Sequence, residues 1–218
     1  LANHVNEGLA GTAAKGLLSG MPPILSFQSV VDTTIEVPAV VSVLYDRLQP
    51  PAVGPDHRLV VYDFNRSTEI EPLLTRDPRD ALERLLADDS RGYEFTVVSN
   101  TAESARSVLA RTGAGPGRAN SSCVLETQWP EGVYSLSHIA PPFPPDDPLY
   151  GGMPPDFDTD RIELGNVVLR GESGALRVSA AGFLRQTFNP FYDFQLGEIR
   201  RFMNLAGPPG CRLPADGQ

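Results

Sequence analysis

The 218-residue sequence is poor in the residues that metal and nucleic-acid sites require. It contains two cysteines and three histidines, and neither set has the spacing of a metal site. Lys15 is the only lysine, the formal net charge is −9, and no basic cluster could follow a phosphate backbone. No apolar run reaches the roughly 18 residues of a membrane span. We therefore expect no metal, no nucleic-acid partner and no membrane span.

The sequence also lacks the motifs of common cofactor and catalytic loops. No G-x-G-x-x-G follows a predicted strand and no G-x-x-x-x-G-K-[ST] exists, which argues against a Rossmann-type nucleotide binder. No G-x-S-x-G occurs, and the nearest segment, 171–175 (GESGA), lacks the second glycine at its place. Residues 156–160 (DFDTD) could begin a calcium loop, but without its glycine and glutamate a solvated loop is the better interpretation. We expect no cofactor.

What is present fits one α/β domain. The length is sufficient for a core, and 41% of the residues are hydrophobic. Strand-like and helical patterns alternate, which predicts a mainly parallel wound sheet flanked by helices. We expect the domain to span 1–205, followed by a tail at 206–218. Predicted strands are 24–31, 59–64, 95–99, 123–128 and 133–136, with 162–169 extended; predicted helices are 3–18, 38–48, one starting with Asp77 as N-cap, 101–111 and 190–203.

The two cysteines, Cys123 and Cys211, lie far apart in the sequence. They could form one disulfide, and two free thiols are an equally good interpretation. The redox compartment is therefore left open.

One stretch of unusual composition organises the candidate site. The apolar run 133–136 leads to His138, and a proline-rich loop follows from Pro141 to Gly152. Proline fixes φ and removes a backbone donor, so this loop cannot be a helix or a central strand. His138 is therefore expected at the end of a strand, where open α/β sheets carry their chemistry. A histidine that only packs against the loop or caps it is the simpler alternative.

Asp32 is the second candidate, because it directly follows the predicted strand 24–31. A hydrolytic triad needs a histidine to move the proton of the nucleophile and a buried carboxylate to hold the imidazole. Asp32 and His138 could reach the same rim of a parallel sheet. The alternative for Asp32 is that it caps the next helix.

The residues around both candidates resemble bacterial α/β-hydrolases of the lysophospholipase and monoacylglycerol-lipase kind. The resemblance lies in 23–35 (PILSFQSVVDTTI), 44–48 (LYDRL), 134–138 (YSLSH) with 142–143 (PF), and, less specifically, 189–192 (NPFY). It covers most of the chain. It implies that Asp32 is the triad acid and His138 the triad base.

In that family the serine lies on a G-x-S-x-G elbow and precedes the acid and the histidine. Here that elbow is missing, and an extra strand-helix unit separates the acid from the histidine. We therefore expect the chain to be the C-terminal portion of an α/β-hydrolase domain, with the nucleophile upstream of Leu1. The whole protein would be a serine esterase or lipase that hydrolyses a small-molecule carboxylic ester through an acyl-enzyme. The fragment alone would be inactive.

The loop after His138 is expected to form one wall of the ester pocket. Phe143, Leu149 and Tyr150 offer apolar surface, while Asp146 and Asp147 would repel anions. A surface loop whose aromatic rings pack on the terminal helix is the alternative.

The first predicted strand, Ile24 to Val31, is apolar on both faces, and its edge should recruit a partner. The N-terminal half of the same protein is the expected partner, and a homodimer is possible. The rival to the whole interpretation is a non-catalytic α/β binding or structural domain, in which Asp32 and His138 have no catalytic role.

Overall fold

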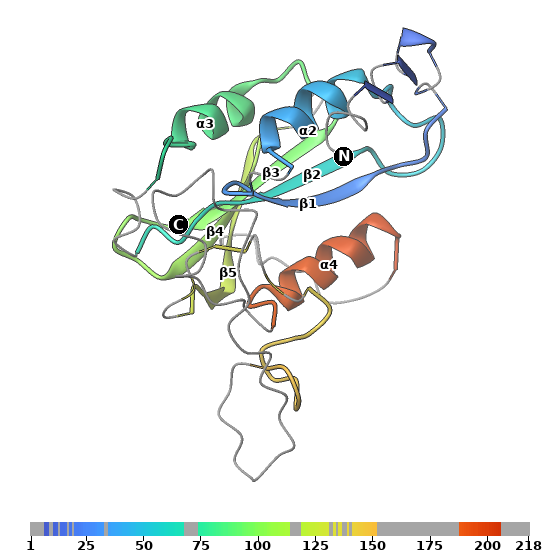
Figure 1. Cartoon of the computed structure of the whole chain (residues 1–218). Coiled ribbons are helices and arrows are strands. Elements are labelled where there is room, and N and C mark those ends of the chain that lie inside the picture. Colours follow the sequence, from blue (N-terminus) through green and yellow to red (C-terminus); the bar gives the residue numbers. More distant parts are fainter. Residues whose placement is uncertain are drawn as a thin grey trace.

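A five-stranded sheet forms the centre of the computed structural model (Figure 1). The structure describes residues 20–32, 35–67, 74–113, 119–130, 141–151 and 188–205, with shorter stretches between 7 and 18 and between 133 and 139. The strands lie in the order of the sequence: β1 (Leu25–Ser29), β2 (Arg58–Tyr62), β3 (Glu94–Asn100), β4 (Ser107–Thr112) and β5 (Ser121–Gln128). β1, β2 and β3 are parallel, whereas β4 and β5 are each antiparallel to the preceding strand.

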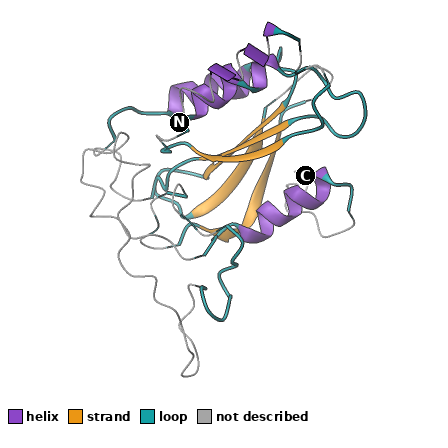
Figure 2. Ribbon diagram, turned by 45° about the vertical axis from the view of Figure 1, so that its right-hand side comes forward, coloured by secondary structure: helices purple, strands orange, loops and turns teal. Residues whose placement is uncertain are grey.

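Helices cover both faces of the sheet (Figure 2). On one face lie α2 (Val37–Val43), a 3₁₀ turn (Tyr45–Arg47) and α3 (Arg79–Ala87). On the other face lies α4 (Tyr192–Phe202). The sheet therefore separates two apolar cores, because alternate strand residues point to opposite faces.

The parallel half confirms the predicted order of elements. The predicted strands 24–31, 59–64 and 95–99 overlap β1, β2 and β3, and helices α2 and α3 form the connections between them. Proline stands in the first turn of α2, where its missing N–H is not needed. The predicted N-cap at Asp77 is wrong, because α3 begins at Arg79 with Pro78 as its N-cap residue. Asp77 lies just before the helix, and its Oδ1 accepts the Arg79 N–H at 2.9 Å.

The predicted helix at 101–111 is wrong, because most of that segment is strand β4. Val108 and Ala110 are buried, whereas Leu109 is only half-buried, which is the two-residue alternation of a strand. A tight turn precedes β4 and reverses the chain. It is closed by hydrogen bonds from the Ala105 N–H to the Ala102 carbonyl at 3.0 Å and from the Thr101 N–H to the Ser107 carbonyl at 2.9 Å.

The sheet is therefore mixed, and only its first three strands follow the predicted parallel winding. The predicted strand at 123–128 is confirmed as β5, which pairs antiparallel with β4. Cys123 on β5 is buried and takes part in a disulfide. Cys211 lies outside the described residues.

The prediction of a strand at 133–136 is also wrong for the residues that the structure describes. Val133, Ser135 and Leu136 have no strand pairing. Val133 and Leu136 are instead buried in the apolar core beneath α4, with Ile139 packed against the same core. The apolar residues of this run therefore pack against one face of the sheet and do not form a further strand.

The terminal helix is confirmed as α4, and Phe191 and Phe194 are buried. His138, half of the predicted helix 3–18, the segment 152–187 and the tail 206–218 lie outside the described residues. No helix in the part that the structure describes is long and apolar enough to cross a membrane.

Candidate functional site at the carboxyl edge of the parallel strands

The carboxyl ends of the three parallel strands meet at one edge of the sheet, here called the carboxyl edge. Ser29 at the end of β1 lies opposite Tyr62 at the end of β2, and Tyr62 lies opposite Val98 of β3. Asp32 follows β1, Asp63 directly follows β2, and Asn100 ends β3. Polar side chains therefore gather where open α/β sheets hold their ligands.

Asp32 holds the loop that leaves β1. Its Oδ1 accepts the Ile35 N–H at 3.2 Å, and its Oδ2 accepts Gln28 Nε2–H at 3.3 Å. Gln28 also donates to the Ile35 carbonyl at 2.6 Å. Asp32 is not the cap of α2, whose N-cap residue is Glu36. The half-buried carboxylate is thus fixed at the carboxyl edge, and its approach to His138 stays a prediction.

Asp63 is more deeply buried than Asp32 and is paired with an arginine. Only 1% of Asp63 is exposed, and its Oδ1 accepts the Phe64 N–H at 2.9 Å. Its Oδ2 accepts Arg66 Nε–H and Nη2–H, each at 2.6 Å. The Arg66 guanidinium also lies over the Phe64 ring, 4.8 Å from its centre. Burial raises the pKa of the Asp63 carboxyl, and the Arg66 charge opposes that shift.

The arginine decides what Asp63 can do. A triad acid must accept an imidazole N–H, and Asp63 would have to loosen its contact with Arg66 to do so. Asp32 accepts two neutral donors, the Gln28 amide and the Ile35 N–H. Asp63 is therefore the poorer triad acid.

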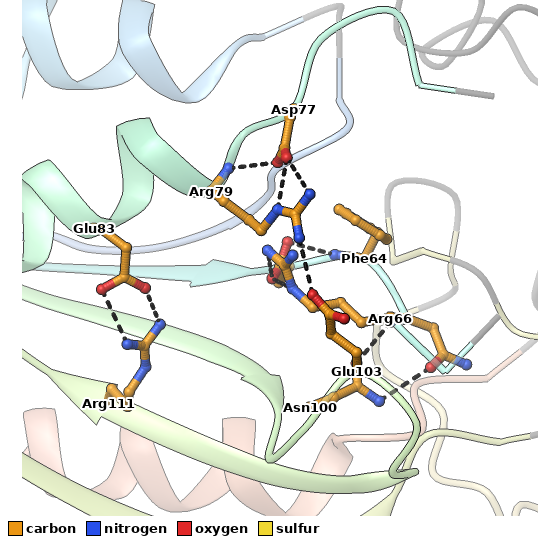
Figure 3. A network of polar contacts seen from close by, with 10 residues as sticks. Phe64, Arg66, Asp77, Arg79, Glu83, Asn100, Glu103 and Arg111 are labelled. Atoms are coloured by element: carbon orange, nitrogen blue, oxygen red, sulfur yellow. Dashed lines mark hydrogen bonds and ion pairs between the residues drawn. The ribbon is translucent and has the colours of Figure 1, made fainter. Parts of the chain in front are cut away.

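Two buried asparagines, Asn65 and Asn100, connect the ends of β2 and β3. Figure 3 shows Asn100 beside Arg66. Asn65 is 1% exposed and its Oδ1 accepts Asn100 Nδ2–H at 3.2 Å. Asn100 in turn accepts the Arg66 N–H at 2.8 Å and donates to the Ala105 carbonyl at 2.6 Å. Asn65 Oδ1 also accepts the N–H and the hydroxyl of Ser67 at 3.1 and 2.7 Å. We call Asn65, Arg66, Ser67 and Asn100 the amide cluster.

The amide cluster reaches the segment that leads to His138. Asn65 Nδ2–H donates to the Val133 carbonyl at 3.0 Å, and this contact is buried. The entry to the segment is held by Trp129, whose N–H donates to the Arg106 carbonyl at 2.8 Å and whose carbonyl accepts Arg106 Nε–H at 2.7 Å. The start of the segment is thereby joined to the carboxyl edge.

The loop 141–151 folds onto itself. The rings of Phe143 and Tyr150 stack with their centres 4.1 Å apart, while Leu149 is 41% exposed. Asp147 Oδ1 accepts the N–H groups of Leu149 and Tyr150 at 2.9 and 2.8 Å, so this carboxylate closes the turn. A side chain at Gly151 would collide with the Pro145 carbonyl. The aromatic rings therefore pack on each other, with Leu149 beside them open to solvent.

Helix α4 places this loop near the same edge. The Asn189 N–H, at the entry to α4, donates to the Phe143 carbonyl at 2.8 Å. The ring of Phe191, next to it, lies 5.8 Å from that of Tyr62 at the carboxyl end of β2. The far end of α4 contacts the opposite edge, because Arg201 pairs with Glu94 at the start of β3. The helix therefore runs antiparallel to the strands, with its entry towards the candidate site.

A cavity of about 340 Å³ lies at the amino ends of the parallel strands, away from Asp32. Gly113 on its wall donates its N–H to the carbonyl of Phe95, near the start of β3. Glu83 and Arg111, also on the wall, form a two-bond ion pair with each other at 2.6 and 3.1 Å (Figure 3). Among the described residues, no group of three or more His, Cys, Asp or Glu side chains could hold a metal ion.

Sequence analysis selected Asp32 but missed the amide cluster and the Asp63–Arg66 pair. A usable signal existed, because residues 63–66 (DFNR) place three polar residues directly after a buried apolar run. Such a run of polar residues at the end of a buried strand must find partners in the fold. The chain matches no protein-family model, no curated protein and no solved structure.

Proposed function

We propose that this chain supplies the acid, Asp32, and the histidine, His138, of a serine esterase or lipase of the α/β-hydrolase kind. The nucleophilic serine would come from a part of the protein outside residues 1–218. One observation carries the proposal: the Asp32 carboxylate is held just beyond the carboxyl end of a parallel strand. The resemblance of the segments around Asp32 and His138 to such hydrolases supports the same assignment.

In this proposal each residue has one role. His138 removes the proton from the serine hydroxyl as its oxygen attacks the ester carbonyl, and returns a proton to the leaving alcohol. Asp32 orients the imidazole and stabilises its protonated form. Water then cleaves the acyl-enzyme with His138 again as the base. A carboxylate has about four acceptor sites, so the bonds from Gln28 and Ile35 are compatible with an additional imidazole N–H.

The edge of β1 could pair with the part of such an enzyme that carries the serine. Within the described residues, β1 is paired on one side only, by β2. A strand edge is a template for another strand, and one that carried the serine would bring it next to Asp32. Pairing of β1 with a second copy is the other outcome, and sedimentation of the complete protein distinguishes a dimer from a monomer.

The ester would be bound against the loop 141–151. Phe143 and Tyr150 offer a stacked aromatic surface with exposed Leu149 beside them. The loop is joined to the entry of α4, on the side of the carboxyl edge. These three side chains would form one wall of a pocket for neutral, apolar acyl groups.

A second candidate function is a non-catalytic α/β binding or structural domain. It is favoured by the bonds of Asp32 to the Ile35 N–H and to Gln28, which are those of an aspartate that only closes a loop. The two candidates differ in one respect: only the enzyme needs a carboxylate at position 32 for turnover.

Ester hydrolysis by the protein from its complete reading frame tests the proposal. With a p-nitrophenyl ester as substrate, Asp32→Asn and His138→Gln should each lower kcat/KM by about 10³–10⁴-fold. Asp88→Asn is the matched control, because Asp88 also closes a turn, accepting the N–H and hydroxyl of Ser90 at 2.9 and 2.6 Å. A crystal structure should place an Asp32 oxygen about 2.6–3.2 Å from an imidazole nitrogen of His138. Equal activity in Asp32→Asn and Asp88→Asn would refute the role of Asp32.

A further inference from the structure

The amide cluster connects parts of the chain that are far apart in the sequence. Asn65 lies in the loop after β2, Asn100 ends β3, and Val133 lies beyond β5. The three are joined by the hydrogen bonds from Asn100 Nδ2 to Asn65 Oδ1 at 3.2 Å and from Asn65 Nδ2 to the Val133 carbonyl at 3.0 Å. A buried amide placed this way fixes a distance as well as satisfying polar groups.

Asn65 is itself held firmly from the other side. Its Oδ1 accepts from Ser67 and Asn100, while its Nδ2 donates to Val133, so the amide orientation follows from its partners. Two contacts of Arg66 hold the backbone next to Asn65. Its guanidinium pairs with Asp63, and its N–H donates to Asn100 Oδ1 at 2.8 Å. The side chain that contacts Val133 therefore projects from a rigid support.

Val133 is five residues before His138 in the sequence. Its side chain and that of Leu136 are 7% and 6% exposed in the core beneath α4, and Ile139 packs against the same core. Apolar contacts of this kind resist separation but tolerate small sliding movements, because they have no preferred direction. The hydrogen bond from Asn65 is directional and adds a fixed point along the segment.

We infer that Asn65 is a positioning residue, which sets the place of the segment 133–139 at the carboxyl edge and thereby aligns His138 for ester hydrolysis. The inference rests on the proposed function. Asn65 touches neither substrate nor reacting atoms in this account, and it acts through the Val133 carbonyl. A displacement of about 1 Å at a catalytic group can cost on the order of 10²-fold in rate, so one tether can matter for turnover.

Two substitutions remove the tether in different ways. Asn65→Asp keeps the size but turns an oxygen towards the Val133 carbonyl, so that two acceptors face each other. Asn65→Ser is too short to reach Val133 and adds no charge, which keeps the test valid if the aspartate variant fails to fold. Ser67→Ala is the matched control, because it removes a hydrogen bond to Oδ1 of the same amide and leaves the bond to Val133 intact.

In the complete protein, Asn65→Ser should lower kcat by about 10–100-fold with KM little changed, whereas Ser67→Ala should leave both near their original values. Hydrogen exchange followed by mass spectrometry should show faster exchange in 129–139 for Asn65→Ser, with β1, β2 and β3 unaffected. Faster exchange in that segment with unchanged kcat would overturn the positioning role. Exchange that rose equally throughout the sheet would also overturn it, since the variant would then be globally destabilised.

The exchange measurement separates this inference from the proposed function. If the unaltered protein hydrolysed no ester, the proposed function would fail, and with it the catalytic part of the inference. Faster exchange limited to 129–139 in Asn65→Ser would still support the tether. Unchanged exchange in that segment would refute the tether even in an active enzyme.

Discussion

The two edges of the parallel strands both bury charge, but they use it differently. At the amino edge, Arg58 and Glu94 begin β2 and β3 and pair with Glu198 and Arg201 of α4. The four charges sum to zero and connect one helix to the sheet. At the carboxyl edge, the amide cluster and the Asp63–Arg66 pair form hydrogen bonds and an ion pair within the loops that follow the strands. One of these hydrogen bonds joins Asn65 to the Val133 carbonyl.

This difference distinguishes buried polar groups that stabilise the fold from buried polar groups that position loops. At the amino edge, the four charges pair with one another across β2, β3 and α4, so their removal should change stability and leave function intact. At the carboxyl edge, Asn65 holds Val133 through its carbonyl, and removal of this contact should affect activity more than stability. Substitutions at the two edges can therefore test the comparison directly.

The largest stability effect is expected at His57, on the amino edge. His57 is fully buried, and its Nδ1 accepts the Ile24 N–H at 3.1 Å, which leaves Nε2–H to donate to the Gln49 carbonyl at 3.0 Å. His57→Leu would remove the partner of both part-buried backbone groups, and a group left unsatisfied away from water costs about 1–3 kcal/mol. Urea denaturation should thus show a loss of about 3 kcal/mol. A loss below about 1 kcal/mol would mean that other groups replace the imidazole.

Glu198→Gln should produce the next largest effect. Glu198 has a side chain only 8% exposed and accepts from Arg58 at 3.4 Å and from Arg201 at 2.6 Å. The neutral amide keeps the shape but leaves two arginines with a single acidic partner, Glu94. We expect a loss of about 2 kcal/mol in unfolding free energy, with ester hydrolysis unchanged.

Glu83→Gln is the matched control for that prediction. Glu83 and Arg111 pair with good geometry, but their side chains are 57% and 35% exposed. The expected loss is under about 1 kcal/mol, because water screens an exposed pair. Equal losses for Glu83→Gln and Glu198→Gln would contradict a special role for buried charge at the amino edge.

Local sequence patterns predicted the parallel half of the fold and strand β5, but not strand β4 or the antiparallel pairing. The apolar run 59–64 and the start of a helix after Asp77 carry their signals within a few residues. The segment 101–111 carries helical signals, because Thr101 could cap a helix and the alanines and the leucine of the segment favour a helix. In the structure, however, most of it is strand β4, which pairs with β3 and β5. Such pairing depends on residues distant in the sequence, so a local pattern could not reveal it.

The candidate site shows the same division. Asp32 was found because its position after a strand can be read from the sequence alone. Asn65 was missed because an asparagine after a strand usually belongs to a turn, and only the folded chain brings Val133 to it. The polar run 63–66 indicated that partners must exist without saying which ones.

Phe143→Ala tests whether the loop beside the carboxyl edge contacts substrate. If the stacked rings of Phe143 and Tyr150 form an acyl wall, kcat/KM should fall more for medium-chain than for acetyl esters. A lost apolar contact is worth about 1–3 kcal/mol only to chains long enough to reach it. Leu205→Ala is a suitable control, because Leu205 is an exposed apolar residue beyond the far end of α4. An equal fall for all chain lengths would assign Phe143 to loop stability.

The buried carboxyl of the carboxyl edge, Asp63, is expected to contribute to stability in a way that depends on pH. Burial raises the pKa of Asp63 above its ordinary value in spite of Arg66. The folded state then binds a proton more tightly than the unfolded chain, so the contribution of Asp63 to stability is fully present below about pH 3.9. That contribution is lost as pH rises through the folded pKa. Asp63→Asn cannot titrate, and it keeps a side chain of the same size beside Arg66.

The measurement is the difference in unfolding free energy between the unaltered chain and Asp63→Asn, followed by urea denaturation from pH 4 upward. Relative to the variant, the unaltered chain should lose stability with rising pH by at most about 1.4 kcal/mol per pH unit. The other carboxylates titrate in both proteins and largely cancel in the difference. A relative gain with rising pH would mean that the Arg66 pair outweighs burial. In that case the carboxyl edge would be stabilised by charge pairing, as the amino edge is, and the comparison between the two edges would lose its electrostatic basis.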